Sequence, residues 1–106
     1  MKLLNMLFKI LEKENNYYVI QLSNKEHDVF KAHFPNNAIL PGFIQIEIIS
    51  QLMKHKISTI KKAKFISLVR PNDIISYTVS TKDAIKYKVL IKKDEKKVSE
   101  IIYEIM

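Results

Sequence analysis

Residues 41–56, PGFIQIEIISQLMKHK, decide the fold of this 106-residue chain, because they form its clearest predicted helix. Pro41 suits the first helical position, where its missing N–H leaves no hydrogen bond unmade. The apolar residues of the segment fall nearly all round the helical cylinder, which predicts a helix buried on most sides. Isoleucine is a poor helix former, so packing must hold this helix in place.

The segments on either side of the helix show the alternation of apolar and polar residues that is typical of strands. Residues 3–12 fit either a helix or a strand, and we favour a strand; a polar turn at 14–16 then leads into a strand over 17–22. After the helix, we predict strands over residues 64–70, 75–81, 85–92 and 98–105. This order predicts a single α+β domain over 1–106, with one antiparallel sheet wrapped around one central helix.

The composition argues against several classes of function. The absence of cysteine excludes disulfides and thiolate metal sites, and the three histidines show no recognisable metal-ligand spacing. The net charge is +7, but seventeen of the eighteen basic residues are lysine, whereas nucleic-acid readers favour the arginine fork. No apolar run reaches the roughly 20 residues of a membrane span, and residues 1–11 read as mature structure. We expect a cytoplasmic protein that binds neither nucleic acid nor membrane.

The chemically informative stretch is residues 33–51, HFPNNAILPGFIQIEIISQ, which contains the only glycine of the chain. His33 titrates near neutral pH and suits a general base, while a carboxyl among isoleucines, Glu47, suits a general acid. The N–H groups at a helix N-terminus suit a developing oxyanion, and Gly42 has no side chain to block the approach. A base, an acid and a group that holds a developing enolate oxygen together suit acid–base chemistry next to a carbonyl, which requires no metal or cofactor.

Each of these residues also has a structural interpretation. Glu47 could belong to a solvated stripe with Ser50, Gln51 and Lys54, which lie on one helix face. Gln51 could orient Glu47 or could simply extend that stripe. Gly42 could do no more than begin the helix.

The stretch resembles the FabZ-type 3-hydroxyacyl-[acyl-carrier-protein] dehydratases, which have the hot-dog fold. The matching positions are His33, Phe34, Pro35, Pro41, Gly42, Glu47 and Gln51, with the family's spacing of fourteen residues from His to Glu. A weaker match follows at residues 64–65 and 71–73. Asn36 and Ala32 stand where the family usually has glycine.

This resemblance implies a hot-dog fold, dehydratase activity in fatty acid or other lipid metabolism, and a set of site residues. The implied catalytic residues are His33 and Glu47, and the implied substrate-binding residues are Gly42, Phe43, Phe34, Pro41 and Gln51. A cis peptide bond between His33 and Phe34 is also implied, although such a bond ordinarily costs about 2.5–4 kcal/mol, and both forms stay open.

The resemblance also implies partners. The substrate would arrive on an acidic acyl carrier protein, which the basic charge of this chain favours. We expect a homodimer, or a dimer of dimers, in which His33 of one chain faces Glu47 of the other. Two alternatives remain: a hot-dog thioesterase that uses Glu47 to activate water, and a non-catalytic acyl-binding subunit.

Overall fold

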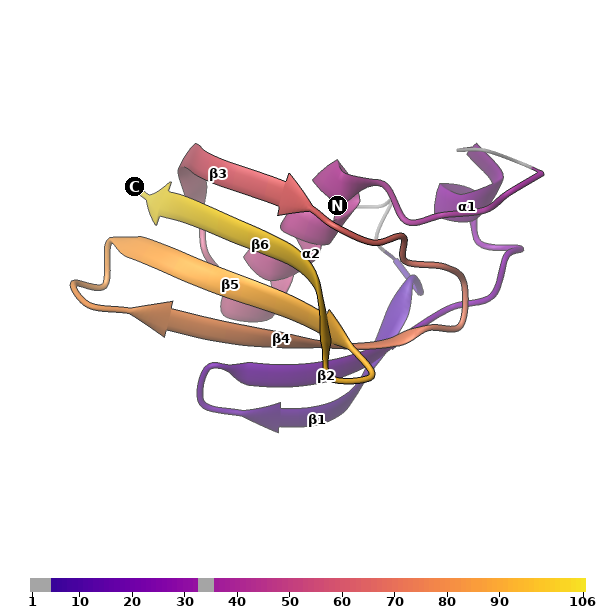
Figure 1. Cartoon of the computed structure of the whole chain (residues 1–106), viewed down its shortest axis with the longest axis horizontal. Coiled ribbons are helices and arrows are strands. Elements are labelled where there is room, and N and C mark those ends of the chain that lie inside the picture. The colour runs from indigo at the N-terminus through magenta and orange to yellow at the C-terminus, as the bar shows by residue number, and fades with distance from the viewer. Residues whose placement is uncertain (1–4, 33–35) are drawn as a thin grey trace.

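One antiparallel sheet of six strands and one long helix form the fold in the computed structural model, which describes residues 5–32 and 36–106 (Figure 1). In the sheet the strands follow the order β1-β2-β4-β5-β6-β3. Their bounds are β1 Phe8–Glu14, β2 Tyr17–Leu22, β3 Ile57–Phe65, β4 Ile74–Thr81, β5 Lys86–Lys93 and β6 Lys96–Ile105. The helices are the short α1, Asp28–Ala32, and the central α2, Gly42–Met53. The predicted α+β architecture is confirmed.

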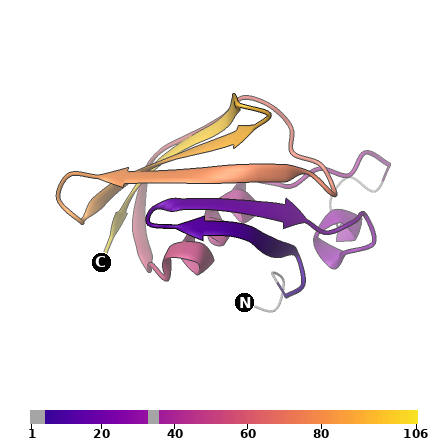
Figure 2. The same ribbon diagram turned by 90° about the horizontal axis from the view of Figure 1, so that it is seen from below.

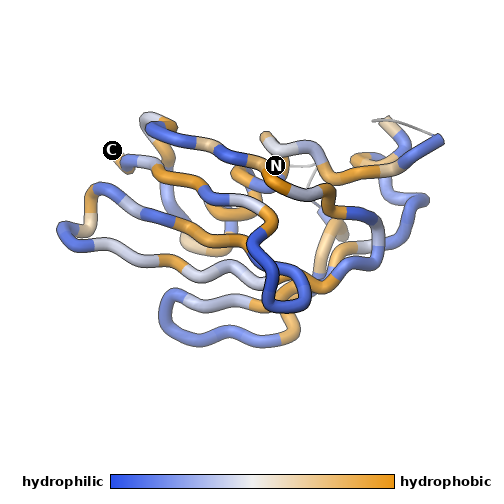
Figure 3. The backbone as a smooth tube through the Cα atoms, in the orientation of Figure 1, coloured by the Kyte–Doolittle hydropathy of each residue, from blue (hydrophilic) through white to orange (hydrophobic). Residues whose placement is uncertain are grey.

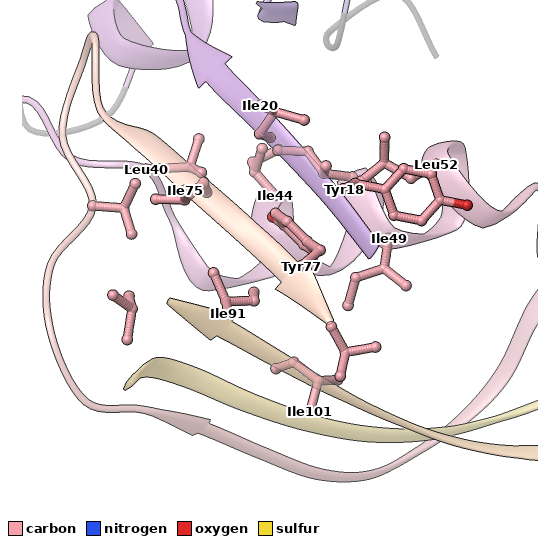
Figure 4. Packing of buried hydrophobic residues seen from close by; sticks show 14 of the residues in the cluster. Tyr18, Ile20, Leu40, Ile44, Ile49, Leu52, Ile75, Tyr77, Ile91 and Ile101 are labelled. Carbon is pink, nitrogen blue, oxygen red and sulfur yellow. The ribbon is translucent and has the colours of Figure 1, made fainter. Parts of the chain in front are cut away.

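The core lies between α2 and the inner face of the sheet, and Figure 2 shows the helix packed below the curved strands. From α2 the buried apolar residues are Ile44, Ile48, Ile49 and Leu52. The close-up shows Ile44, Ile49 and Leu52 among sheet residues, which include Ile20, Ile75, Tyr77, Ile91 and Ile101 (Figure 4). Burial of each such side chain contributes about 1.5–3 kcal/mol, which explains how an isoleucine-rich segment remains helical.

The meander β4-β5-β6 follows the predicted alternation closely. Tyr77 lies opposite Ile91, and Val89 lies opposite Ile101, so inward-facing residues meet across neighbouring strands. In β5 the buried Tyr87, Val89 and Ile91 alternate with less buried residues, most of them lysines, which gives the mixed colouring of its tube in Figure 3. The β1–β2 hairpin is also confirmed, with Asn16 in its turn at a φ of 61°.

The helix ends earlier than the sequence predicts. We expected it to continue to residue 56, but α2 ends at Met53 and Lys54 adopts the left-handed conformation, with φ 56° and ψ 42°. The Lys54 N–H then bonds to the carbonyl oxygen of Ser50, and the Ser50 hydroxyl donates to the carbonyl oxygen of His55. These bonds close the last turn of the helix and accompany the turn of the chain towards β3.

Two further predictions need correction. The strand predicted over 64–70 is in fact β3, over Ile57–Phe65, and two register shifts against β6 disturb its alternation. Residues 66–70 lie outside the strands, where the Leu40 N–H donates to the carbonyl oxygen of Val69 at 2.7 Å. Helix α1 was not predicted, because five residues are too few to show a helical period. In the described part of the chain no helix has the length and apolar character needed to cross a membrane.

Candidate active site

The two sides of α2 differ sharply in exposure. The side towards the sheet is closed, and Ile44 and Ile48 are both fully buried. The other side is open: Phe43, Glu47 and Gln51, spaced four residues apart, form an exposed stripe along the helix. The expectation of a helix buried on most sides is therefore met on one side only within a single chain.

A groove runs between the open side of α2 and strand β3. Its volume is about 430 Å³, and its lining residues are Phe43, Ile46, Glu47, Ser50, Lys56, Ile57 and Ile60. The Glu47 carboxylate forms no hydrogen bond or ion pair with any residue that the structure describes. The rest of the lining is apolar except for Ser50 and Lys56, neither of which bonds to the Glu47 carboxylate, so this carboxylate is available to a bound molecule.

The N-terminus of α2 lies next to this groove. Pro41 has an extended conformation, and its carbonyl oxygen accepts the N–H groups of Ile44 and Gln45, both at 3.1 Å. No side chain caps the helix, and the Gly42 N–H has no hydrogen-bond partner within residues 5–32 and 36–106. Such an unpaired N–H at a helix start attracts negative charge.

Gly42 is also required by packing. A side-chain carbon added at Gly42 would lie 2.6 Å from Cζ of Phe65, so the Phe65 ring of β3 rests directly on the glycine. A second, mostly apolar hollow of about 460 Å³ opens at this point and shares Phe43 with the groove that holds Glu47. The helix start, Phe43 and the groove thus form one continuous surface.

A buried polar cluster fixes the position of α2 from its closed side. The Gln45 side chain is 3% exposed; its Oε1 accepts from the Ser99 hydroxyl at 2.6 Å, and its Nε2 donates to the carbonyl oxygen of Leu40 at 3.4 Å. The Tyr77 hydroxyl donates to the Gln45 carbonyl oxygen at 3.2 Å. Burial raises the pKa of the Tyr77 hydroxyl, which keeps it protonated as a donor. This cluster could not be predicted from the sequence, because glutamine is an exposed residue in most proteins.

The segment that enters α2 is fixed from the β3–β4 connection. Arg70 donates from Nη1 to the Asn37 side-chain oxygen at 2.8 Å, and its own N–H donates to the Asp73 carboxylate at 2.7 Å. Asp73 in turn pairs with Lys93 at 2.9 Å. The only arginine of the chain therefore ties the approach to the helix to the sheet.

The structure brings together part of the predicted site. Gly42, Phe43, Pro41 and Glu47 lie on one continuous surface, and Gln51 is exposed one turn beyond Glu47. His33 and Phe34, with the peptide bond between them, lie outside the described residues. Within the described part of the chain no group of three or more His, Asp or Glu side chains could hold a metal ion.

The sequence reasoning missed the β3 residues that form the second wall of the groove. These are Ile57, Ile60 and Phe65. The strand predicted over 64–70 left out Ile57 and Ile60 and contained Phe65 near its start. The spacing of Ile57 and Ile60 is odd rather than even because of the register shift at residues 57–59, so simple alternation cannot find it.

Comparison with known proteins identifies the family. The pattern of the ApeI-like dehydratases, described as ApeI dehydratase, matches residues 9–101. This chain belongs to the ApeI-like dehydratase family. It is also 34% identical over 65 residues to a 3-hydroxyacyl-[acyl-carrier-protein] dehydratase FabZ from Levilactobacillus brevis. That match covers 49% of this chain and 44% of the relative, so the chain spans less than half of its length.

Solved structures support the fold of this ApeI-like chain. It superposes on the dehydratase heterocomplex ApeI:P from Xenorhabdus doucetiae with a TM-score of 0.70 and 21% identity, covering 92% of this chain and 96% of that one. An uncharacterized protein from Erwinia carotovora gives a TM-score of 0.65 at 15% identity, with 95% and 97% covered. The predicted hot-dog fold and the resemblance to FabZ-type dehydratases are confirmed.

Proposed function

We propose that this ApeI-like chain catalyses the dehydration of 3-hydroxyacyl thioesters carried by an acyl carrier protein to trans-2-enoyl thioesters. The observation that carries the proposal is the placement of Glu47 in an apolar groove that adjoins the unpaired N–H of Gly42. Five residues of helix separate the two groups, or about 8 Å along the axis. A thioester carbonyl and a C3 hydroxyl, each with a hydrogen bond of about 3 Å, span such a distance.

The roles of the residues follow from the bonds that change. His33 takes the proton from C2, the C3–O bond breaks, and Glu47 gives its proton to the departing hydroxyl, which leaves as water. The electron pair of the C2–H bond becomes the C2=C3 double bond. During this step the Gly42 N–H stabilises negative charge on the thioester oxygen. Phe34, Phe43 and Pro41 contact the bound substrate. Gln51, one helical turn after Glu47, orients the Glu47 carboxyl.

This mechanism requires a second chain over the groove. A carboxyl donates a proton only when it is protonated, and a water-free apolar setting favours that form. In the single chain Glu47 is exposed, and so are its apolar neighbours Phe43 and Ile60. We therefore propose that a second hot-dog chain covers the groove and places its His33 equivalent opposite Glu47. A relative, ApeI:P, forms a heterocomplex, and the sequence prediction for this chain is a homodimer or a dimer of dimers.

Delivery of the substrate by an acidic carrier protein fits the charge of the chain. Lys64 directly precedes Phe65, which lines the hollow at the helix start, and Lys64 carries no ion pair with any described residue. Docking of an acidic carrier to such residues weakens with salt, because the Debye length falls to about 8 Å at physiological ionic strength.

The test is an assay with 3-hydroxyacyl and enoyl thioesters, using the chain alone and the chain isolated from its own host with any bound partner. Appearance of the conjugated enoyl absorbance supports the proposal. Release of free thiol would indicate the thioesterase alternative, and no reaction in either preparation would indicate a non-catalytic subunit.

A matched pair of variants tests the role of Glu47. Glu47→Gln should lower the rate by about 10²–10⁴-fold, because the amide cannot act as the acid. Glu12→Gln makes the same chemical change at an exposed position of β1 and should leave the rate within about twofold.

A further inference from the structure

The groove that holds Glu47 has two chemically different ends, because strand β3 runs back along α2 (Figure 1). At the end of β3 the Phe65 ring lies against Gly42, the first residue of the helix. Just before β3 begins, the His55 N–H donates to the carbonyl oxygen of Ser50 at 3.1 Å, near the last turn of the helix. One end of the groove therefore lies at the start of α2, and the far end lies beside Ser50.

The far end of the groove carries a cation, Lys56. Among the described residues that line the groove, Lys56 is the sole basic residue and Glu47 the sole acidic one. Lys56 is exposed and forms no ion pair with any residue that the structure describes. The Ser50 hydroxyl already donates to the carbonyl oxygen of His55. At this end the Lys56 ammonium is therefore the side-chain donor that remains for a bound molecule.

The backbone of Lys56 is held in place by its surroundings. The ring of the preceding His55 packs on Tyr87 with 4.5 Å between ring centroids, and its Nδ1 lies 2.9 Å from the Tyr103 hydroxyl. The carbonyl oxygen of Lys56 accepts the Met106 N–H at 3.3 Å. The Lys56 side chain thus leaves an anchored backbone, and its ammonium can reach a molecule in the groove without a rearrangement of the chain.

The helix sets the length of acyl chain that would reach Lys56. In the proposed substrate the thioester oxygen lies at Gly42 and the C3 hydroxyl at Glu47, so the rest of the acyl group points along the groove towards Ser50. Ser50 is three residues beyond Glu47, or about 4.5 Å along the helix axis. An extended chain advances about 1.2 Å per bond, so about four bonds beyond C3 bring the end of the acyl group to Lys56.

We propose that this chain acts on 3-hydroxyacyl thioesters whose acyl group ends in a carboxylate, about three to five bonds beyond C3, and that Lys56 binds this carboxylate. A substrate that fills the groove displaces water from the Lys56 ammonium, which is unfavourable unless an anion replaces that water. Glu47 does not serve as this anion, because in the proposed function it is the protonated acid. A carboxylate at the end of the substrate forms a charge-assisted hydrogen bond with Lys56 instead. This inference rests on the proposed function and names its substrate class.

The experiment compares two series of 3-hydroxyacyl pantetheine thioesters with about six to eight acyl carbons. One series ends in a carboxylate and the other in a methyl group, and pantetheine itself carries no charge. The enoyl absorbance gives kcat/KM for the chain alone and for the chain isolated from its own host with any bound partner. At about 50 mM salt the carboxylate series should have a kcat/KM at least about tenfold higher than the methyl series. At about 500 mM salt this ratio should shrink, because screening weakens the ion pair.

Matched variants assign the preference to one lysine. In Lys56→Met the ratio between the two series should fall below about threefold, because the ion pair is lost. Lys82→Met makes the same change in the β4–β5 connection, away from the groove, and should keep the wild-type ratio. Circular dichroism checks that each variant is folded, and Lys56→Gln replaces Lys56→Met if that one unfolds. Equal kcat/KM for the two series in the wild type, or an undiminished ratio in the Lys56 variant, would overturn the proposal.

Binding is measured apart from turnover, so the two proposals fail separately. Titration calorimetry uses the saturated acyl thioesters without the 3-hydroxyl group, which can bind but cannot lose water. Tighter binding of the carboxylate series without dehydration of its 3-hydroxy counterparts would overturn the proposed function and keep the ligand class. Equal dehydration of both series would do the reverse, and the absence of both binding and turnover would overturn both.

Discussion

The closed and open sides of α2 belong to one helix but differ in both composition and exposure. Ile44 and Ile48, on the closed side, are fully buried against the sheet, whereas Phe43, on the open side, is 55% exposed beside the exposed Glu47. The closed side is complete within one chain and supplies its stability. The open side holds the candidate chemistry, and it is this side that we propose a second chain covers. Because the α-helix turns by about 100° per residue, neighbouring residues such as Phe43 and Ile44 point to these two different sides.

The largest expected difference between the two sides is in stability. Ile48→Ala should lower the free energy of unfolding by about 2–5 kcal/mol, because it leaves a cavity in a packed core. Phe43→Ala removes a larger side chain but should change the free energy of unfolding of the single chain by less than about 1 kcal/mol, because about half of the Phe43 surface is exposed. Urea denaturation of both variants measures the two changes in the free energy of unfolding. Equal losses would mean that Phe43 is packed as tightly as Ile48.

A second pair of variants compares two glutamines of the same helix. Gln45→Ala leaves the buried Ser99 hydroxyl without its acceptor and should cost about 1–3 kcal/mol. Gln51→Ala, at an exposed position, should stay within about 0.5 kcal/mol. The Gln45→Ala/Ser99→Ala double variant should recover part of the loss in the same denaturation experiment. Additive losses would show that the hydrogen bond does not couple the two residues.

A smaller effect is expected where the two sides meet, at Gly42. Gly42→Ala crowds the Phe65 ring, which should lower the free energy of unfolding by about 1–3 kcal/mol. Alanine is also the better helix former, which offsets this loss by up to about 1 kcal/mol. The net loss should therefore be near 1 kcal/mol. In a Phe65→Ala background the same change should become stabilising. A loss of the same size in both backgrounds would place the cause in the backbone instead of the ring.

The smallest expected effect concerns the outer face of the sheet, where Glu100 joins β6 to β3. Hydrogen bonds from Lys62 and Lys97 lower the pKa of the Glu100 carboxyl from 4.5 to about 2. A carboxyl with a lower pKa when folded stabilises the protein above pH 4.5, and this contribution is lost as the pH falls towards 2. Thermal unfolding from pH 5 to pH 2 should thus show a shallower decline for Glu100→Gln than for the wild type. Parallel curves would show that these ion pairs add nothing to the attachment of β3.

The sequence predicts those parts of the fold whose pattern is local. The meander β4-β5-β6 alternates regularly, and Pro41-Gly42 marks the start of α2, so both could be found from periodicity and turn chemistry. The position of β3 was predicted wrongly, because two register shifts break its alternation and because lysines occupy its centre. The end of α2 was missed because it depends on a left-handed Lys54, a residue type that gives no such signal.

The candidate site is predictable only in part, for a different reason. Glu47 and Gly42 could be named from the motif, and their shared surface follows from one helix. Glu47 is exposed in the single chain, so the burial that the proposed mechanism needs has to come from the proposed second chain and could not be predicted from the sequence. Gln45 was missed because a buried glutamine is recognised only by its partners. Here these are Ser99, which lies on β6, and the backbone of Leu40, which precedes the helix.

The uncovered edge of β3 has a consequence for the supply of the protein in a cell. Newly made copies that have not met a partner display an apolar groove beside a free strand edge, and chaperones and proteases act on such surfaces. Copies made in excess would be short-lived, whereas assembled copies would persist. The abundance of this chain would then depend on how soon each new copy has its groove and strand edge covered.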